Sequence, residues 1–191
     1  TDLSAAEAAI DRIIPLTRVA GHWLNPEVLI SLDALLIVLF QALISYLTRR
    51  WPTLRAMLVG TTVATASWAL PAISPAALIV SLGIVVWSFG EMTCSARFFE
   101  YCGTVAPKDQ VALYLGYSFF AIFIGNFYSG PWAGWLYENF IRLPHEAGSA
   151  VQPWPFFLGV MLMGVFSVIG LAIYGRFINP DQARRNEGGA A

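Results

Sequence analysis

The stretch PEVLISLDALLIVLFQALISYL, residues 26–47, is apolar over the length that a membrane-crossing helix requires. A helix needs about 20 predominantly apolar residues to cross the hydrocarbon core of a bilayer. Further apolar stretches follow at about 54–70, 75–101, 110–137 and 155–177, and a polar loop with Pro and Gly is expected at 138–154. The sequence therefore predicts an all-α membrane protein with five transmembrane helices, a bundle over residues 26–178.

The composition favours the same fold class. The chain has 191 residues, of which 57% are hydrophobic and 12% are charged, whereas a soluble domain carries about 25% charged residues. The net charge of −1 argues against a nucleic-acid partner. We therefore expect an integral, multi-pass protein surrounded by the lipid bilayer.

Basic residues divide unequally between the two sides of the five expected spans. One side carries Arg49, Arg50, Arg55, Arg97, Lys108, Arg176, Arg184 and Arg185, and the other carries Arg12, Arg18 and Arg142. Because loops rich in Lys and Arg stay in the cytoplasm, this bias predicts a cytoplasmic C-terminus. Residues 179–191 would then be a cytoplasmic tail.

Residues 1–25 are expected to lie on the extracytoplasmic side. Ser4 and Glu7 have the spacing of a capping box, and isoleucines follow at helical spacing. This pattern predicts a short amphipathic helix at the outer interface, or the end of an upstream membrane helix. Because the chain begins at Thr1 rather than Met, we expect it to be part of a longer protein.

Two carboxylates fall inside apolar stretches, Glu91 and Asp33. A charged side chain at the centre of a membrane helix costs about 2.5–3.5 kcal/mol on insertion scales, so such residues usually mark a functional path. We therefore expect Glu91 and Asp33 to take part in substrate binding or proton coupling. The alternatives are a structural hydrogen bond for Glu91 and contact with outside water for Asp33.

Four other side chains are predicted to line a substrate cavity: Trp87, Gln41, Asn126 and Tyr128. Trp87 shares a helix face with Glu91, and Gln41 extends the polar stripe of Asp33, because residues four apart stack on one face. Asn126 has a second interpretation, a hydrogen bond to a neighbouring helix.

The fourth apolar stretch contains the pattern G-x-x-x-G at Gly130 and Gly134, which is typical of close helix packing in membranes. Pro131 lies between them and predicts a bend. This stretch is therefore expected to be either a bending helix beside the cavity or a tightly packed one.

Arg97 and Glu100 are three residues apart near the cytoplasmic end of the third stretch, close enough to pair on a helix. One interpretation is a cytoplasmic gate, in which the ion pair holds that side closed. The alternative is an interfacial pair that only anchors the helix end.

No catalytic or metal-binding pattern is present. The sequence lacks G-x-S-x-G, a P-loop and H-E-x-x-H, and His22 and His145 have no partner at ligand spacing. Cys94 and Cys102 are interpreted as small packing residues. We therefore assign no catalytic residue, no metal site and no cofactor, and we expect the protein not to be an enzyme.

Several short motifs resemble those of a known transporter family. They are Leu24-Asn25-Pro26, Gly90-Glu91 followed by Ala106-Pro107-Lys108, Gly125-Asn126, and RFFEY at residues 97–101. With these motifs the chain resembles the C-terminal half of a major facilitator superfamily transporter, closest to the proton-coupled oligopeptide transporter-like branch.

The resemblance implies that the five spans are helices eight to twelve, most of one six-helix half. It also implies that Glu91 takes the role of the helix-ten glutamate, which is implicated in substrate binding and coupling. The family's proton-binding motif on helix one and its helix seven have no counterpart in this chain, so the identity of the substrate is not inherited.

The expected function is proton-coupled secondary transport, a symport that moves a small polar solute by alternating access. It would require the N-terminal half or a partner subunit. The alternative is a non-transporting, transporter-like scaffold or accessory subunit of a larger membrane complex.

Overall fold

The structure of the chain is a computed structural model that describes residues 18–19, 22–23, 26–74, 76–149 and 151–177. The predicted amphipathic helix near residues 4–14 and the predicted tail at 179–191 lie outside these residues. The described part is all-α, apart from a two-stranded antiparallel pair formed by β1 (Arg18–Val19) and β2 (His22–Trp23).

Five helices in the described part are long and apolar enough to cross a membrane, which confirms the predicted fold class. The chain is therefore a multi-pass membrane protein associated with a lipid bilayer. The spans are Leu29–Thr48, Thr53–Ile73, Leu78–Val105, Val111–Glu146 and Trp154–Phe177.

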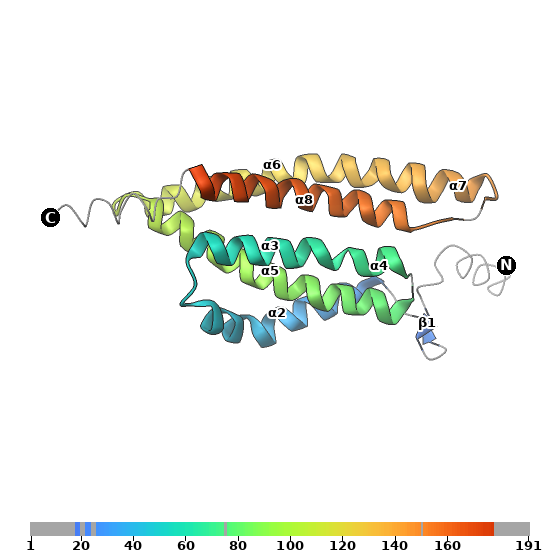
Figure 1. The fold of residues 1–191 in the computed structure, drawn as a ribbon, viewed down its shortest axis with the longest axis horizontal. Coiled ribbons are helices and arrows are strands. Elements are labelled where there is room, and N and C mark those ends of the chain that lie inside the picture. The colour runs from blue at the N-terminus through green and yellow to red at the C-terminus, as the bar shows by residue number, and fades with distance from the viewer. Residues whose placement is uncertain (1–17, 20–21, 24–25, 75, 150, 178–191) are drawn as a thin grey trace.

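The helices that form these spans are shown in Figure 1. Their bounds are α2 Pro26–Thr48, α3 Thr53–Ser67, α4 Ala69–Ile73, α5 Ala77–Val105, α6 Val111–Tyr137, a π-helical turn Glu138–Arg142, α7 Leu143–Glu146 and α8 Trp154–Phe177. Prolines occupy the first turns of α2 and α8, where a missing N–H removes no helical hydrogen bond.

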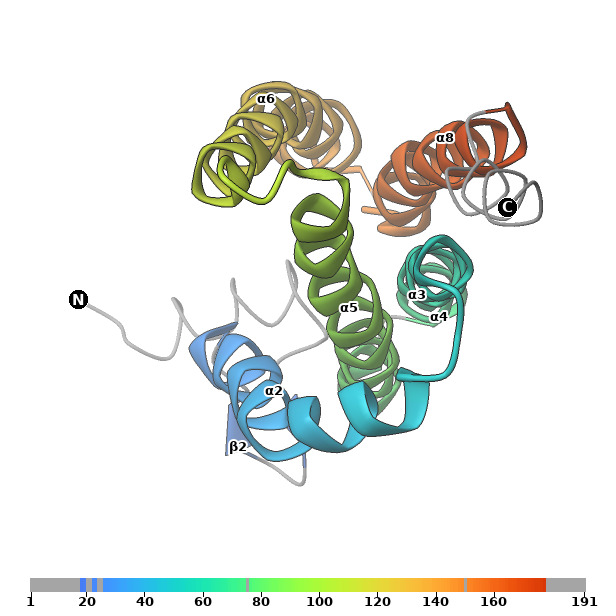
Figure 2. The ribbon, with the colours of Figure 1, turned by 90° about the vertical axis from the view of Figure 1, so that its left-hand side faces the viewer.

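Helix α5 occupies the centre of the bundle. It contacts α2, α3, α4 and α6, and the view along the bundle places α2 and α3 on different sides of it (Figure 2). Helix α8 packs against α3, α4 and α6. Helix α2 packs substantially only against α5, so α5 connects α2 to the rest of the bundle.

The contact between α3 and α5 depends on two glycines. A Cβ atom added to Gly60 would lie 2.7 Å from the carbonyl oxygen of Gly90, and one added to Gly90 would lie 2.7 Å from the carbonyl oxygen of Gly60. The hydroxyl of Thr61 and the thiol of Cys94 meet beside them at 3.3 Å. Small residues at this crossing let the two backbones touch, which is how membrane helices associate closely.

The tight contact expected at Gly130 and Gly134 is not found. A Cβ atom at either position would meet no heavy atom within 4 Å in the described part of the chain. The pattern G-x-x-x-G therefore marks no close crossing among the described helices. The glycines that make the close crossing, Gly60 and Gly90, lie on two different helices, and Ala64, four residues after Gly60, contacts Gly90 as well.

Two spans differ in detail from the sequence prediction. The second is interrupted at Trp68, which separates α3 from α4. The fourth passes through Pro131 without a break in α6 and continues helically to Glu146, where a loop was expected. Arg142 pairs at 3.0 Å with Glu138 and with Glu146, and these pairs four residues apart stabilise the extra turns.

Candidate functional site

The site is centred on Asp33, which lies half-buried on α2 and faces α5. The hydroxyl of Ser88 donates a hydrogen bond of 2.5 Å to Oδ1 of Asp33. Ser88 is fully buried, so this bond joins α2 to the interior of the bundle. A hydrogen bond of this kind lowers the cost of holding a carboxylate in an apolar region.

Beside Asp33 lies a cavity of about 410 Å³ between α2, α4, α5 and α8. Its volume falls in the range of about 300–1,000 Å³ that is typical of small-molecule sites. Most of its walls are apolar or aromatic. The residues that shape it chemically are Asp33, Ser67, Trp68, Pro71, Trp87 and Phe157.

The interruption between α3 and α4 forms one wall of the cavity. Pro71 has no N–H, so it cannot give the carbonyl of Ser67 the hydrogen bond that a continuous helix supplies. Gly83 of α5 leaves room for this wall, because a Cβ atom there would lie 3.3 Å from Cδ of Pro71. The ring of Trp68, at the interruption itself, stacks on Phe157 with centroids 6.2 Å apart.

Glu91 lies half-buried on α5, one turn beyond Ser88. Its Oε2 is buried and has no hydrogen-bond partner among the described residues. Buried polar atoms are nearly always hydrogen-bonded, so each exception requires an explanation. A carboxyl oxygen in this position is available for a proton or for a ligand.

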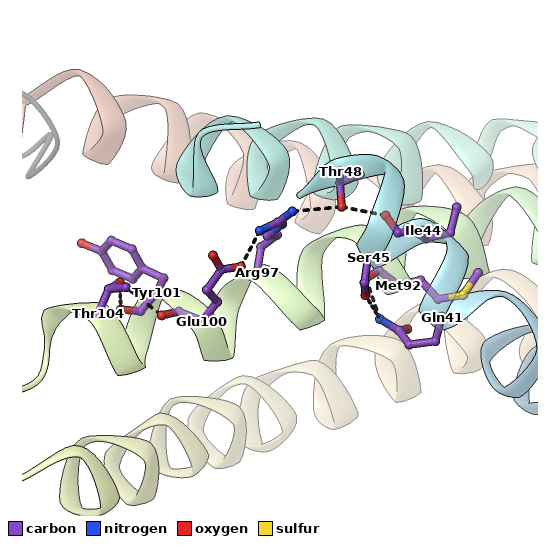
Figure 3. Close-up of polar contacts among 9 residues, drawn as sticks. All are labelled: Gln41, Ile44, Ser45, Thr48, Met92, Arg97, Glu100, Tyr101 and Thr104. Carbon is purple, nitrogen blue, oxygen red and sulfur yellow. Dashed lines mark hydrogen bonds and ion pairs between the residues drawn. The ribbon is translucent and has the colours of Figure 1, made fainter. Parts of the chain in front are cut away.

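Gln41 is not among the residues that line the cavity beside Asp33, and its side chain joins α2 to α5. Its Nε2 donates to the carbonyl oxygen of Met92 and to the hydroxyl of Ser45, both at 3.3 Å (Figure 3). The predicted cavity-lining role of Gln41 remains a prediction. In this structure its amide holds the two helices together.

The predicted pair of Arg97 and Glu100 is present, with Nη1 of Arg97 2.5 Å from Oε2 of Glu100. The side chain of Arg97 is 7% exposed and that of Glu100 is 48% exposed. Nη2 of Arg97 also donates to the hydroxyl of Thr48 at 3.3 Å (Figure 3). Arg97 thus attaches the C-terminal end of α2 to α5, which is compatible with either an anchor or a gate.

Asn126 and Tyr128 lie on α6, which contributes no residue to the cavity wall. Both are exposed, Tyr128 by 66%. All residues of α6 from 119 to 128 are likewise exposed, so nothing in the described part of the chain covers this section of the helix. The cavity-lining role of both residues remains a prediction.

Sequence reasoning identified Asp33 and Trp87 but missed Ser88, Trp68, Pro71 and Phe157. Pro71 was the available signal, because a proline inside a helix removes one hydrogen bond and kinks or breaks the helix, although α6 continues through Pro131. Nothing in the sequence indicates that Phe157, far along the chain, stacks on Trp68.

The described residues contain no group of three His, Cys, Asp or Glu side chains that could hold a metal ion. Cys94 and Cys102 are free thiols of intermediate burial.

The sequence matches no model of a protein family, and neither the curated proteins nor the solved structures show a match.

Proposed function

We propose that the chain is part of a secondary active transporter of the major facilitator type, which moves a small polar solute by alternating access and couples this movement to protons. The chain would supply most of one six-helix half. The observation that carries the proposal is the buried Oε2 of Glu91, which has no hydrogen-bond partner among the described residues; Glu91 lies one turn along α5 from Trp87 of the cavity wall.

The position of the two carboxyl groups supports proton coupling. Ionisable residues inside membrane spans are a recurring feature of proton relays in pumps and transporters. Asp33 is held by Ser88, whereas Glu91 has a free acceptor, so the two groups have different tasks: Asp33 contacts the solute and Glu91 carries the proton.

The interrupted span also supports transport. Substrate sites of many secondary transporters are formed by discontinuous helices near the middle of the membrane. Here the turn at Trp68, where α3 gives way to α4 while the backbone of Trp68 stays in the right-handed helical region, lies in the cavity wall. Arg97 and Glu100 would close the cytoplasmic side, where Arg97 joins α2 to α5.

The test uses the full-length protein reconstituted in vesicles that enclose a pH-sensitive dye. A panel of amines, amino acids, sugars and dipeptides is added, and at least one is expected to change the internal pH. Glu91→Gln is expected to abolish that response, and the matched change Glu138→Gln, in the π-helical turn outside the cavity, is expected to preserve it. An unchanged response of Glu91→Gln would remove Glu91 from the mechanism.

A second candidate function is a non-transporting scaffold or accessory subunit. It is favoured by residues 119–128 of α6, which are exposed on every face of the helix, and by the open space at Gly116, Gly125, Gly130 and Gly134. Neighbouring helices of another chain pack well on such small residues. Reconstituted protein that moves no protons with any solute of the panel would support this function.

A further inference from the structure

We propose that the cavity beside Asp33 binds a monovalent organic cation with an apolar body, such as an alkyl- or arylammonium ion. If the chain is part of the transporter proposed above, the transported solute is then an organic cation, and this conclusion about transport rests on the proposed function. The binding itself follows from the charge and the ring positions of the cavity.

The charge of the cavity favours a cation. Asp33 is the one ionisable side chain among the described residues that line it, and no Lys or Arg of the described chain pairs with it. A carboxylate in a low-dielectric region is costly unless an opposite charge neutralises it. A bound cation would supply that charge, with Ser88 holding the carboxylate in place.

The rings of the cavity favour the same class of ligand. Trp68, Trp87 and Phe157 line it, and the planes of Trp68 and Phe157 lie nearly parallel, at 22°. The faces of aromatic rings attract cations, and aromatic groups surround the quaternary ammonium ions that proteins recognise.

The same features disfavour other ligands. An anion would be repelled by Asp33, and a sugar would find few hydrogen-bonding groups on walls that are mostly apolar. The acyl chain of a lipid would gain nothing from a carboxylate. Asp33 therefore distinguishes an organic cation from the other occupants of an apolar cavity.

The experiment measures binding of radiolabelled benzyltrimethylammonium to the full-length protein in lipid nanodiscs. This cation carries a charge at every pH. Its uncharged carbon analogue, neopentylbenzene, has the same shape and serves as the competitor. We expect the cation to bind saturably. The neutral analogue is expected to compete about tenfold or more weakly than the unlabelled cation, because the charge contact is lost.

Variants of the cavity test the contribution of each group. Asp33→Asn is expected to weaken binding by about tenfold or more, while Asp33→Glu keeps the charge and retains binding. Trp87→Leu is expected to weaken binding through loss of the ring. Asp109→Asn makes the same chemical change at an exposed position outside the cavity and is expected to bind like the wild type. The thermal unfolding midpoint of each variant establishes that it is folded.

Three results would overturn the inference: wild-type protein that does not bind the cation, equal competition by the neutral analogue, or wild-type affinity in folded Asp33→Asn. Saturable binding that needs Asp33, with no proton movement in vesicles, would support the cation site and overturn the proposed transport. Proton movement driven by another solute, without binding of the cation, would overturn the cation site alone.

Discussion

The crossing of Gly60 and Gly90 is the closest approach of two helix backbones described above. Each glycine occupies a place where a side chain would meet the backbone of the other helix. Lipid offers no hydrophobic driving force for helix association, so the contact depends on close packing and on polar bonds such as that of Thr61 and Cys94. Loss of either glycine would force α3 and α5 apart.

Gly60→Ala is expected to lower the free energy of unfolding by about 1–3 kcal/mol, the usual cost of overpacking. The added Cβ would lie 2.7 Å from the amide nitrogen of Cys94 and from the carbonyl oxygen of Gly90. The measurement is unfolding of the purified protein in a titration with denaturing detergent.

Gly103→Ala is the matched control, because a Cβ atom at this position of α5 meets nothing within 4 Å. It is expected to raise stability by about 0.5–1 kcal/mol, since alanine favours the helix. Equal stability of the two variants would contradict the role of the glycine crossing.

At the scale of the helix, the second span shows why a proline inside an apolar stretch has consequences beyond its own position. Pro71 separates α3 from α4 and exposes the wall of the cavity around Trp68. Hydropathy alone predicts one continuous helix, because the whole stretch Thr53–Ile73 is apolar enough to cross a membrane.

Pro71→Ala is expected to join α3 and α4, because alanine supplies the N–H that the carbonyl of Ser67 lacks. Hydrogen–deuterium exchange of the amides between residues 68 and 72 would then slow relative to wild type. Exchange in α6, which contributes no residue to the cavity wall, serves as the internal reference. Unchanged exchange at 68–72 would show that the interruption does not depend on the proline.

The sequence predicted the spans well because span length and hydropathy are local properties. It predicted the end of the fourth span poorly. The turn Glu138–Arg142 resembles a loop in composition, yet it is helical. The ion pairs of Arg142 with Glu138 and with Glu146 stabilise this helical turn. Composition reports polarity, whereas continuation of a helix depends on whether the polar side chains find partners along it.

At the scale of the molecule, the arrangement of helices around α5 was not predictable from the sequence. In a membrane the faces toward lipid and toward protein are both apolar, so hydropathy does not reveal which helices meet. The candidate site shows the same division. Asp33 and Glu91 were predicted because charge in a membrane is costly, while Ser88 and Phe157 could be assigned only once α2, α5 and α8 were placed.

The excess of Lys and Arg predicts the orientation of the whole molecule. In a background with Cys94→Ala and Cys102→Ala, His145→Cys is expected to react with an impermeant maleimide in intact cells. Lys108→Cys is expected to react only after the membrane is permeabilised. Both positions are exposed, so accessibility does not favour one over the other, and the reverse pattern would contradict the predicted orientation.

The packing of α2 mainly against α5 has a consequence for the order of synthesis. Asp33 finds its partner Ser88 55 residues later in the chain, which at about 5–20 residues per second means a delay of roughly 3–11 seconds on the ribosome. During that interval α2 resides in the bilayer without α5. Until the third span has been translated, α2 must therefore stay in the bilayer although its carboxylate has no partner. The apolar side chains of its span, which give it a mean hydropathy of 2.1, must supply the free energy for this.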